Sequence, residues 1–262
     1  MYETLLLEKN NGIATITFNR PEAGNAFDMT SYNDLYNAIQ ECGADDEVRV
    51  VILTGAGKHF SAGGDIKEFK ALIEKGTGLD AKDVATAGDT AEAIRRCPKP
   101  VIAMINGAAV GAGCSIALAC EFRVMSPKSM MTMAFVNMGF SGDTGAIYYL
   151  TKLAGVAKAT EMMALGEPLF APEALRLGLV TKVSESEETL ADTAIALAKK
   201  LIAKPGRAIA LQKRLFFEFF YRDLPQFSIR EGDYMHECSL TEDHVEAVNA
   251  FLEKRKPVFK GK

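Results

Sequence analysis

Few residues in this sequence are of the types that bind metals or form disulfide frameworks. Of 262 residues, only three are histidine and five are cysteine. The cysteines are odd in number, widely spaced and form no Cys-x-x-Cys pair: Cys42, Cys97, Cys114, Cys120 and Cys238. The histidines do not cluster with them, so neither a disulfide framework nor a zinc site is indicated. We predict no metal site and reduced thiols, as in a cytoplasmic protein.

The sequence also lacks long apolar runs and an extended basic cluster. The longest apolar stretches, 101–105 and 107–114, are too short and too glycine-rich to span a bilayer. The N-terminus carries an early acid and no basic segment, so we expect no secretory signal. With a net charge of -4 and basic residues concentrated only after Lys254, nucleic acid is not the expected partner. These features predict a cytoplasmic protein that binds neither membranes nor nucleic acid.

What the sequence does contain is an alternation of β and α patterns followed by helices alone. The Asn11-Gly12 pair between two alternating runs indicates a β-hairpin. The expected strands are 5–9, 13–18, 48–54, 101–105, 122–125, 130–135 and 179–183. The expected helices are 30–42, 65–75, one ending at 96, 114–120, 144–153, 158–165, 172–177, 189–202, 207–221, 228–238 and 242–254. The fold class is therefore α/β, with a body over 1–200 and a helical region over 201–262.

Two segments carry separate expectations. Residues 76–88 are polar and contain glycine, which predicts a mobile stretch without regular structure. The segment 216–221 is too rich in aromatic residues for a helix that faces solvent. We expect it to pack on the body or on another subunit.

Two glycine-rich junctions share one design: a buried strand, a tight loop and the start of a helix. They are 59–66, with Gly63 and Gly64, and 106–114, with Gly111 and Gly113. Small residues allow a ligand to approach the backbone, and a helix start offers unpaired N–H groups. Two such junctions facing each other would stabilise a developing oxyanion. Neither junction fits a dinucleotide-binding or phosphate-loop pattern.

A series of short motifs runs along nearly the whole chain. They are Asn19-Arg20-Pro21 with Asn25-Ala26-Phe27, then 51–55, 60–66, 99–107, 111–114, 171–174, 178–180 and 251–257. In this order they resemble the crotonase family, also called the enoyl-CoA hydratase/isomerase superfamily. The resemblance implies a spiral of ββα turns, with C-terminal helices that assemble homotrimers, commonly stacked as hexamers. It also implies an acyl-CoA thioester substrate, with coenzyme A as part of the substrate and no separate cofactor.

The resemblance further implies roles for particular residues. The oxyanion would be held by the backbone N–H groups of Gly64 and Ala112. The residues expected to contact the substrate are Ala23, Ala62, Gly64, Asp65, Ile66, Lys67, Phe135, Phe251 and Lys254. Of these, Phe251 and Lys254 would approach the coenzyme A portion, across a subunit boundary in some assemblies.

The sequence departs from the family pattern at the two acids of the hydratases. Those enzymes use two glutamates for general acid–base chemistry. The matching positions here are Ser115 and Phe135. One acid remains in the region, Asp143. An Asp before a helix is often an N-cap, but the resemblance implies a catalytic carboxylate here, and neighbouring apolar residues would raise its pKa.

A single carboxylate suits one reaction in particular. A polarised thioester acidifies the α-carbon, and in an unsaturated acyl group the γ-carbon, so one base can move a proton between them. This predicts an enoyl-CoA isomerase with catalytic Asp143, Gly64 and Ala112. Three alternatives stay open: a hydratase of unusual substrate, a non-catalytic CoA-binding subunit, and an enzyme similar to 4-chlorobenzoyl-CoA dehalogenases with Asp143 as nucleophile. The last is disfavoured because the chain has no Trp and no His in 82–96.

Overall fold

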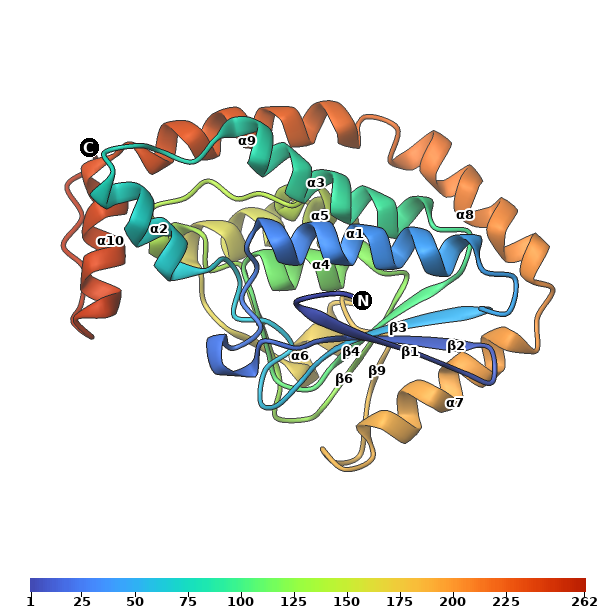
Figure 1. The fold of residues 1–262 in the computed structure, drawn as a ribbon. Helices are drawn as coiled ribbons and strands as arrows, with labels where there is room; N and C mark the ends of the chain where they lie inside the picture. Colours follow the sequence, from blue (N-terminus) through green and yellow to red (C-terminus); the bar gives the residue numbers. More distant parts are fainter.

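The computed structural model describes residues 1–262, and its core is a six-stranded sheet (Figure 1). The strand order is β1-β2-β3-β4-β6-β9. These strands are β1 (Leu5–Asn10), β2 (Ile13–Phe18), β3 (Val50–Gly55), β4 (Val101–Ile105), β6 (Phe122–Met125) and β9 (Lys182–Val183). Only the β1–β2 pair is antiparallel, and it forms the expected hairpin with Asn11 and Gly12 at positive φ. The remaining pairs are parallel, and each requires a crossover connection.

A second sheet of three short strands lies next to the glycine-rich junctions. It consists of β5 (Ala108–Val110), β7 (Met130–Thr132) and β8 (Leu169–Phe170). Strand β5 also pairs with the first junction through a bridge between Ser61 and Ala109. The small sheet therefore holds the two junctions in register.

Helices cover both faces of the large sheet. They are α1 (Met29–Ala44), α2 (Ile66–Glu74), α3 (Ala81–Arg96), α4 (Ala112–Ala119), α5 (Ala146–Leu165), α6 (Ala171–Arg176), α7 (Leu190–Ile202), α8 (Gly206–Phe220), α9 (Leu224–Ser239) and α10 (Glu242–Leu252). Short 3₁₀ turns occupy Pro21–Ala23 and Val136–Met138. One large core joins α1, α3, α4 and α5 to the sheet, and a smaller one joins α7 to its other face. The sheet is thus buried on both sides, which explains its continuous apolar strands.

Residues 81–88 of the segment 76–88 differ from its prediction, whereas residues 76–80 form neither helix nor strand. Helix α3 begins at Ala81, with the Asp80 side chain accepting the Lys82 N–H at 2.8 Å, and continues through Gly88. A β-carbon at Gly88 would lie 2.5 Å from the Ser228 side chain of α9. The glycine marks the close crossing of two helices, and its reading as a loop residue was wrong.

The C-terminal helices run along one side of the molecule and end beside α2 (Figure 1). In α8, Phe217 is buried and packs against the guanidinium of Arg96. Phe216, Phe219 and Phe220 remain 59%, 69% and 60% exposed. Only part of the aromatic segment therefore packs on the body of the same chain. No helix of the structure is both long and apolar enough to cross a membrane.

Candidate active site

The first glycine-rich junction leaves a backbone donor free. After β3 the chain passes through Gly63 and Gly64 and enters α2, which Asp65 caps by accepting the Lys67 N–H at 3.0 Å. Gly63 has a φ of 94°, a conformation that L side chains rarely adopt. The Gly63 carbonyl and the Asp65 N–H both pair with Phe27, whereas the Gly64 N–H between them donates to no backbone acceptor.

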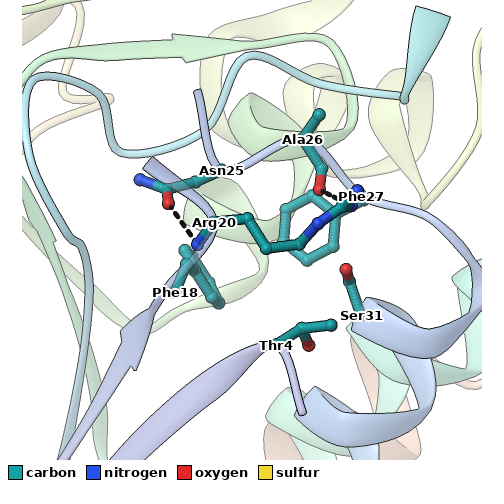
Figure 2. A pocket seen from close by; sticks show the side chains of 7 residues that line it. All are labelled: Thr4, Phe18, Arg20, Asn25, Ala26, Phe27 and Ser31. Carbon is teal, nitrogen blue, oxygen red and sulfur yellow. Dashed lines mark hydrogen bonds between the residues drawn. The ribbon is translucent and has the colours of Figure 1, made fainter. Parts of the chain in front are cut away.

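Arg20 and Asn25 brace this junction. The Arg20 guanidinium pairs with Asp65 at 2.8 Å and with Asp28 at 2.9 Å, and donates to the Ala26 carbonyl at 2.9 Å. Figure 2 shows Arg20 and Asn25 among the residues that line a small cavity. The cavity has a volume of about 10 Å³, which leaves room for one water molecule and none for a substrate. The first motif of the chain is therefore structural support for the Gly64 loop.

The second junction supplies a second donor. Gly111 precedes α4 with φ 50° and ψ −120°, a conformation essentially limited to glycine. Ala112 is the first residue of α4, so its N–H has no acceptor within the helix and lies at the positive end of the helix dipole. The local sequence thus dictates a free N–H at Ala112.

Direct contacts bring the two junctions together. The Ser61 N–H donates to the Ala108 carbonyl at 3.1 Å, and the Val110 N–H donates to the Ser61 carbonyl at 2.9 Å. A β-carbon at Gly113 would lie 2.6 Å from the Ser61 β-carbon, so a larger residue there would push the junctions apart. The two junctions that carry the Gly64 and Ala112 N–H groups are therefore in direct contact.

Asp143 reaches the same region from the loop before α5. Its backbone carbonyl lies 3.4 Å from the Ser115 hydroxyl, which also donates to the Gly111 carbonyl at 3.2 Å. Its side chain does not cap α5, whose N-cap is Gly145. One carboxylate oxygen accepts a hydrogen bond from the Thr144 hydroxyl at 2.8 Å, and the other makes no hydrogen bond within the chain. The structure therefore does not support the helix-cap interpretation of Asp143.

Burial changes the acidity of this carboxyl. Desolvation raises the pKa of Asp143 from 3.8 to about 6, and the Thr144 hydroxyl partly offsets the rise. A carboxylate with this pKa accepts a proton more readily than an ordinary Asp and is still ionised at neutral pH. Its electrostatic state suits a general base.

The two positions that replace the hydratase glutamates are occupied by groups without acid–base capacity. Ser115 is fully buried and its hydroxyl bonds to backbone carbonyls. Phe135 is buried, and its ring would contact β-carbons at Gly111 and Gly142 at 3.8 and 3.7 Å. Phe135 thus forms an apolar wall between the oxyanion junction and the Asp143 loop.

Phe69 and Phe140 form a second apolar wall, which was not predicted from the sequence. A β-carbon at Gly64 would lie 2.6 Å from the Phe69 ring, which packs against Phe140 with centroids 5.1 Å apart. His244 of α10 stacks on Phe140 at 4.2 Å, and burial lowers its pKa. The spacing of apolar residues within α2 could have suggested Phe69. Its partners Phe140 and His244 lie far from it in the sequence, so the sequence alone does not link the three residues. His244 is buried and covers the loop that contains Met138 and Phe140.

The other predicted substrate contacts fall into two groups. Around the first junction, Ala62 and Lys67 are exposed to solvent, and Ala23 and Ile66 are half-buried. The Asp65 side chain pairs with Arg20 and caps α2. Phe251 and Lys254 lie exposed at the end of α10, which packs beside α2 through a Lys70–Asn249 hydrogen bond of 3.2 Å. No group of three or more His, Cys, Asp or Glu side chains is arranged to hold a metal ion.

Comparisons with known proteins show which family the chain belongs to. Residues 8–262 match the family model described as Enoyl-CoA hydratase/isomerase. A trans-2-decenoyl-[acyl-carrier-protein] isomerase of Streptococcus mutans is 34% identical, with 100% of this chain and 99% of that protein covered. A short-chain-enoyl-CoA hydratase of Clostridium acetobutylicum is 35% identical, covering 96% and 95%. The crystal structure of an enoyl-CoA hydratase from Mycobacterium avium subsp. paratuberculosis superposes with a TM-score of 0.89 at 29% identity, covering 99% and 100%.

Proposed function

The chain belongs to the enoyl-CoA hydratase/isomerase family, an enzyme family with the crotonase fold, and we propose that it shifts a double bond within an enoyl-CoA thioester. Asp143 acts as the single acid–base group. The N–H groups of Gly64 and Ala112 hold the thioester oxygen as it gains negative charge. The relatives named above include both an isomerase and a hydratase, so the choice between them depends on the site of this chain.

The observation that carries the proposal is the state of Asp143. It is a partly buried carboxylate with a raised pKa and one oxygen free of hydrogen bonds, beside two positions that lack the hydratase acids. Water addition in the family pattern needs two carboxylates to hold and deprotonate the water. Proton transfer between two carbons of one acyl chain needs one.

The reaction balances with that one group. Asp143 removes a proton from the α-carbon of a 3-enoyl thioester, and the electron pair moves into a dienolate. The carboxylic acid then returns a proton to the γ-carbon, which leaves a 2-enoyl thioester and an ionised Asp143. Each backbone donor contributes about 3–4 kcal/mol to the stability of the negatively charged intermediate.

Thr144 and Tyr32 orient the base. The Tyr32 hydroxyl lies 3.4 Å from the Thr144 hydroxyl, which donates to Asp143 at 2.8 Å. Burial and the charge of Asp143 raise the pKa of Tyr32 well above its usual value. Tyr32 therefore stays neutral and donates to the Thr144 hydroxyl oxygen, while the Thr144 proton points at the Asp143 carboxylate.

The direct test compares Asp143→Asn with the wild type on 3-enoyl-CoA substrates. Loss of the carboxylate is expected to lower kcat by at least about 100-fold, while binding of the CoA ester changes by less than about threefold. Asp46→Asn, an exposed Asp remote from the site, is the matched control. Unchanged kcat in Asp143→Asn would refute the proposal, as would a 3-hydroxyacyl-CoA as the main wild-type product.

We propose coenzyme A as the acyl carrier and a homotrimer or hexamer as the assembly. Exposed Lys67 and Lys254 offer positive charge to CoA phosphates, and the exposed aromatic side chains of α8 suit a subunit interface. One relative is named for an acyl-carrier-protein substrate, so both thioesters of the same acyl chain should be compared. Light scattering of the purified chain tests the assembly, and a monomer would contradict it.

A further inference from the structure

A second acid, remote in sequence, lies behind the active-site loop. Glu231 of α9 is 5% exposed, and one of its carboxyl oxygens accepts the Gly145 N–H at 2.9 Å. The other oxygen is buried and has no hydrogen-bond partner. Burying an ionised carboxyl group without full hydrogen bonding destabilises the fold, and a neutral carboxyl group costs less. A buried polar group without a partner is therefore worth explaining by a functional role.

Glu231 is bonded to a turn whose backbone is strained. Gly142, Thr144 and Gly145 have φ values of 112°, 56° and 75°, on both sides of Asp143. Most of the backbone strain lies at Thr144, because a β-branched residue rarely adopts a positive φ. Strain of this kind persists only where surrounding contacts fix the backbone, and it is common where a catalytic group must be presented.

The contacts that fix this turn come from four helices, including Ser115 of α4, whose hydroxyl lies 3.4 Å from the Asp143 carbonyl. Glu231 of α9 holds Gly145, and Tyr32 of α1 contacts the Thr144 hydroxyl. The Tyr149 ring of α5 lies against Gly145, where a β-carbon would be 2.6 Å away. Glu231 makes the shorter of the two side-chain hydrogen bonds to the backbone of the turn, at 2.9 Å against 3.4 Å for Ser115.

We propose that Glu231 is a positioning residue for Asp143, which it holds in reach of the substrate through the Gly145 N–H and the turn before α5. The inference rests on the proposed function of Asp143. Glu231 itself is covered by protein and does not touch the substrate.

The charge state of Glu231 follows from its surroundings. Burial first, and then the charge of Asp143, raise the pKa of Glu231 well above its usual value. The other titratable groups facing this region are Tyr149, with Arg95 5.3 Å from its ring centroid, and Tyr32. From α3, the uncharged Gly88 lies against Ser228 of α9 and the uncharged Ala81 lies against Gly232 of α9. Two neighbouring carboxyl groups in an apolar site do not both ionise readily, so Asp143 ionises while Glu231 keeps its proton.

The protonation state of Glu231 affects how activity depends on pH. At neutral pH the site contains one negative charge, on Asp143, and the dienolate forms near a neutral Glu231. As pH rises through the pKa of Glu231, a second buried negative charge appears and opposes the charge that develops on the substrate. We expect kcat to fall on the alkaline side because of Glu231 and on the acid side because of Asp143.

The test uses two substitutions at Glu231 with three measurements each. Glu231→Ala removes the acceptor for Gly145, and kcat is expected to fall by roughly 30- to 100-fold with KM within about twofold. Glu231→Gln keeps an acceptor and a neutral group, so it should restore most of kcat and abolish the alkaline decline. Amide hydrogen exchange at Gly145 should accelerate in the Ala variant and stay slow in the Gln variant.

Each outcome has a definite meaning. A normal kcat in Glu231→Ala with faster Gly145 exchange overturns the positioning role, because the turn would have loosened without effect. An unaltered alkaline decline in Glu231→Gln refutes the assignment of that limb. If Glu231→Ala does not fold, the Gln variant and the wild-type pH profile still decide the question. Failure of the proposed function is separate, since it appears as full activity in Asp143→Asn whatever the result at Glu231.

Discussion

Replacing Asp143 by Asn should make the protein more stable at neutral pH while it removes activity. The fold opposes ionisation of this carboxyl, and raising its pKa from 3.8 to about 6 costs the ionised form about 3 kcal/mol. Asn keeps an oxygen that accepts the Thr144 hydroxyl and carries no charge to desolvate. Because Asp143 retains some contact with solvent, we expect a gain of about 1–3 kcal/mol in the free energy of unfolding at pH 7.

The sign of the pH dependence makes this prediction specific. Between the unfolded and folded pKa values, the native state binds more protons than the unfolded state, so wild-type stability falls as pH rises through this window. Below about pH 4 the carboxyl is protonated in both states, and the advantage of Asp143→Asn should vanish. Above about pH 6 the advantage should be complete.

The assay is urea denaturation of the wild type, Asp143→Asn and the control Asp46→Asn at several pH values. Protein concentration must be equal throughout, because assembly stabilises the native state by mass action. A stability gain for Asp143→Asn that grows between pH 4 and 6 supports the burial of a charged catalytic base. Equal or lower stability at every pH would refute the reasoning, because the carboxylate would not be desolvated in the native protein.

Three further substitutions probe the walls and donors of the site. Phe69→Ala removes the ring that lies against Gly64. On a panel of acyl-CoA esters, the variant should have a higher kcat/KM for bulky acyl groups relative to short ones. An unchanged ratio would exclude Phe69 as a wall of the acyl pocket. Gly113→Ala would force the start of α4 away from Ser61. We expect kcat/KM to fall by at least about tenfold and the free energy of unfolding to fall by about 1–3 kcal/mol. Wild-type kinetics in this variant would show that the two junctions need not touch. Lys254→Ala should raise KM by about threefold without changing kcat if the side chain contacts the CoA phosphates, and an unchanged KM would rule that contact out.

Much of the fold could be predicted because local signals and tertiary structure agree. The Asn11-Gly12 hairpin is encoded within a few residues and was confirmed. The crotonase-type α/β architecture was confirmed as well. The start of α3 was missed because Gly88 is a poor helix former, and its reason for being there is the crossing with Ser228, more than a hundred residues away.

In the site, too, locally encoded features could be predicted and contacts between distant residues could not. Free N–H groups at Gly64 and Ala112 follow from glycine-rich strand–helix junctions, which can be recognised in sequence. The residues that surround the Asp143 loop come from separate helices: Tyr32, His244 and Glu231 have no spacing that links them to the loop. Glu231 in particular is an ordinary acid on a helix until its burial and its bond to Gly145 are known.

Solvent deuterium tests the central claim most directly. The wild type, incubated in D₂O with a 3-enoyl-CoA and examined by NMR, should yield the 2-enoyl-CoA with deuterium at the α- or γ-carbon. Asp143→Asn should bind the ester and produce neither the shift nor the label. Label incorporation that persists in Asp143→Asn, or a wild-type product with water added and no migrated double bond, would contradict the account.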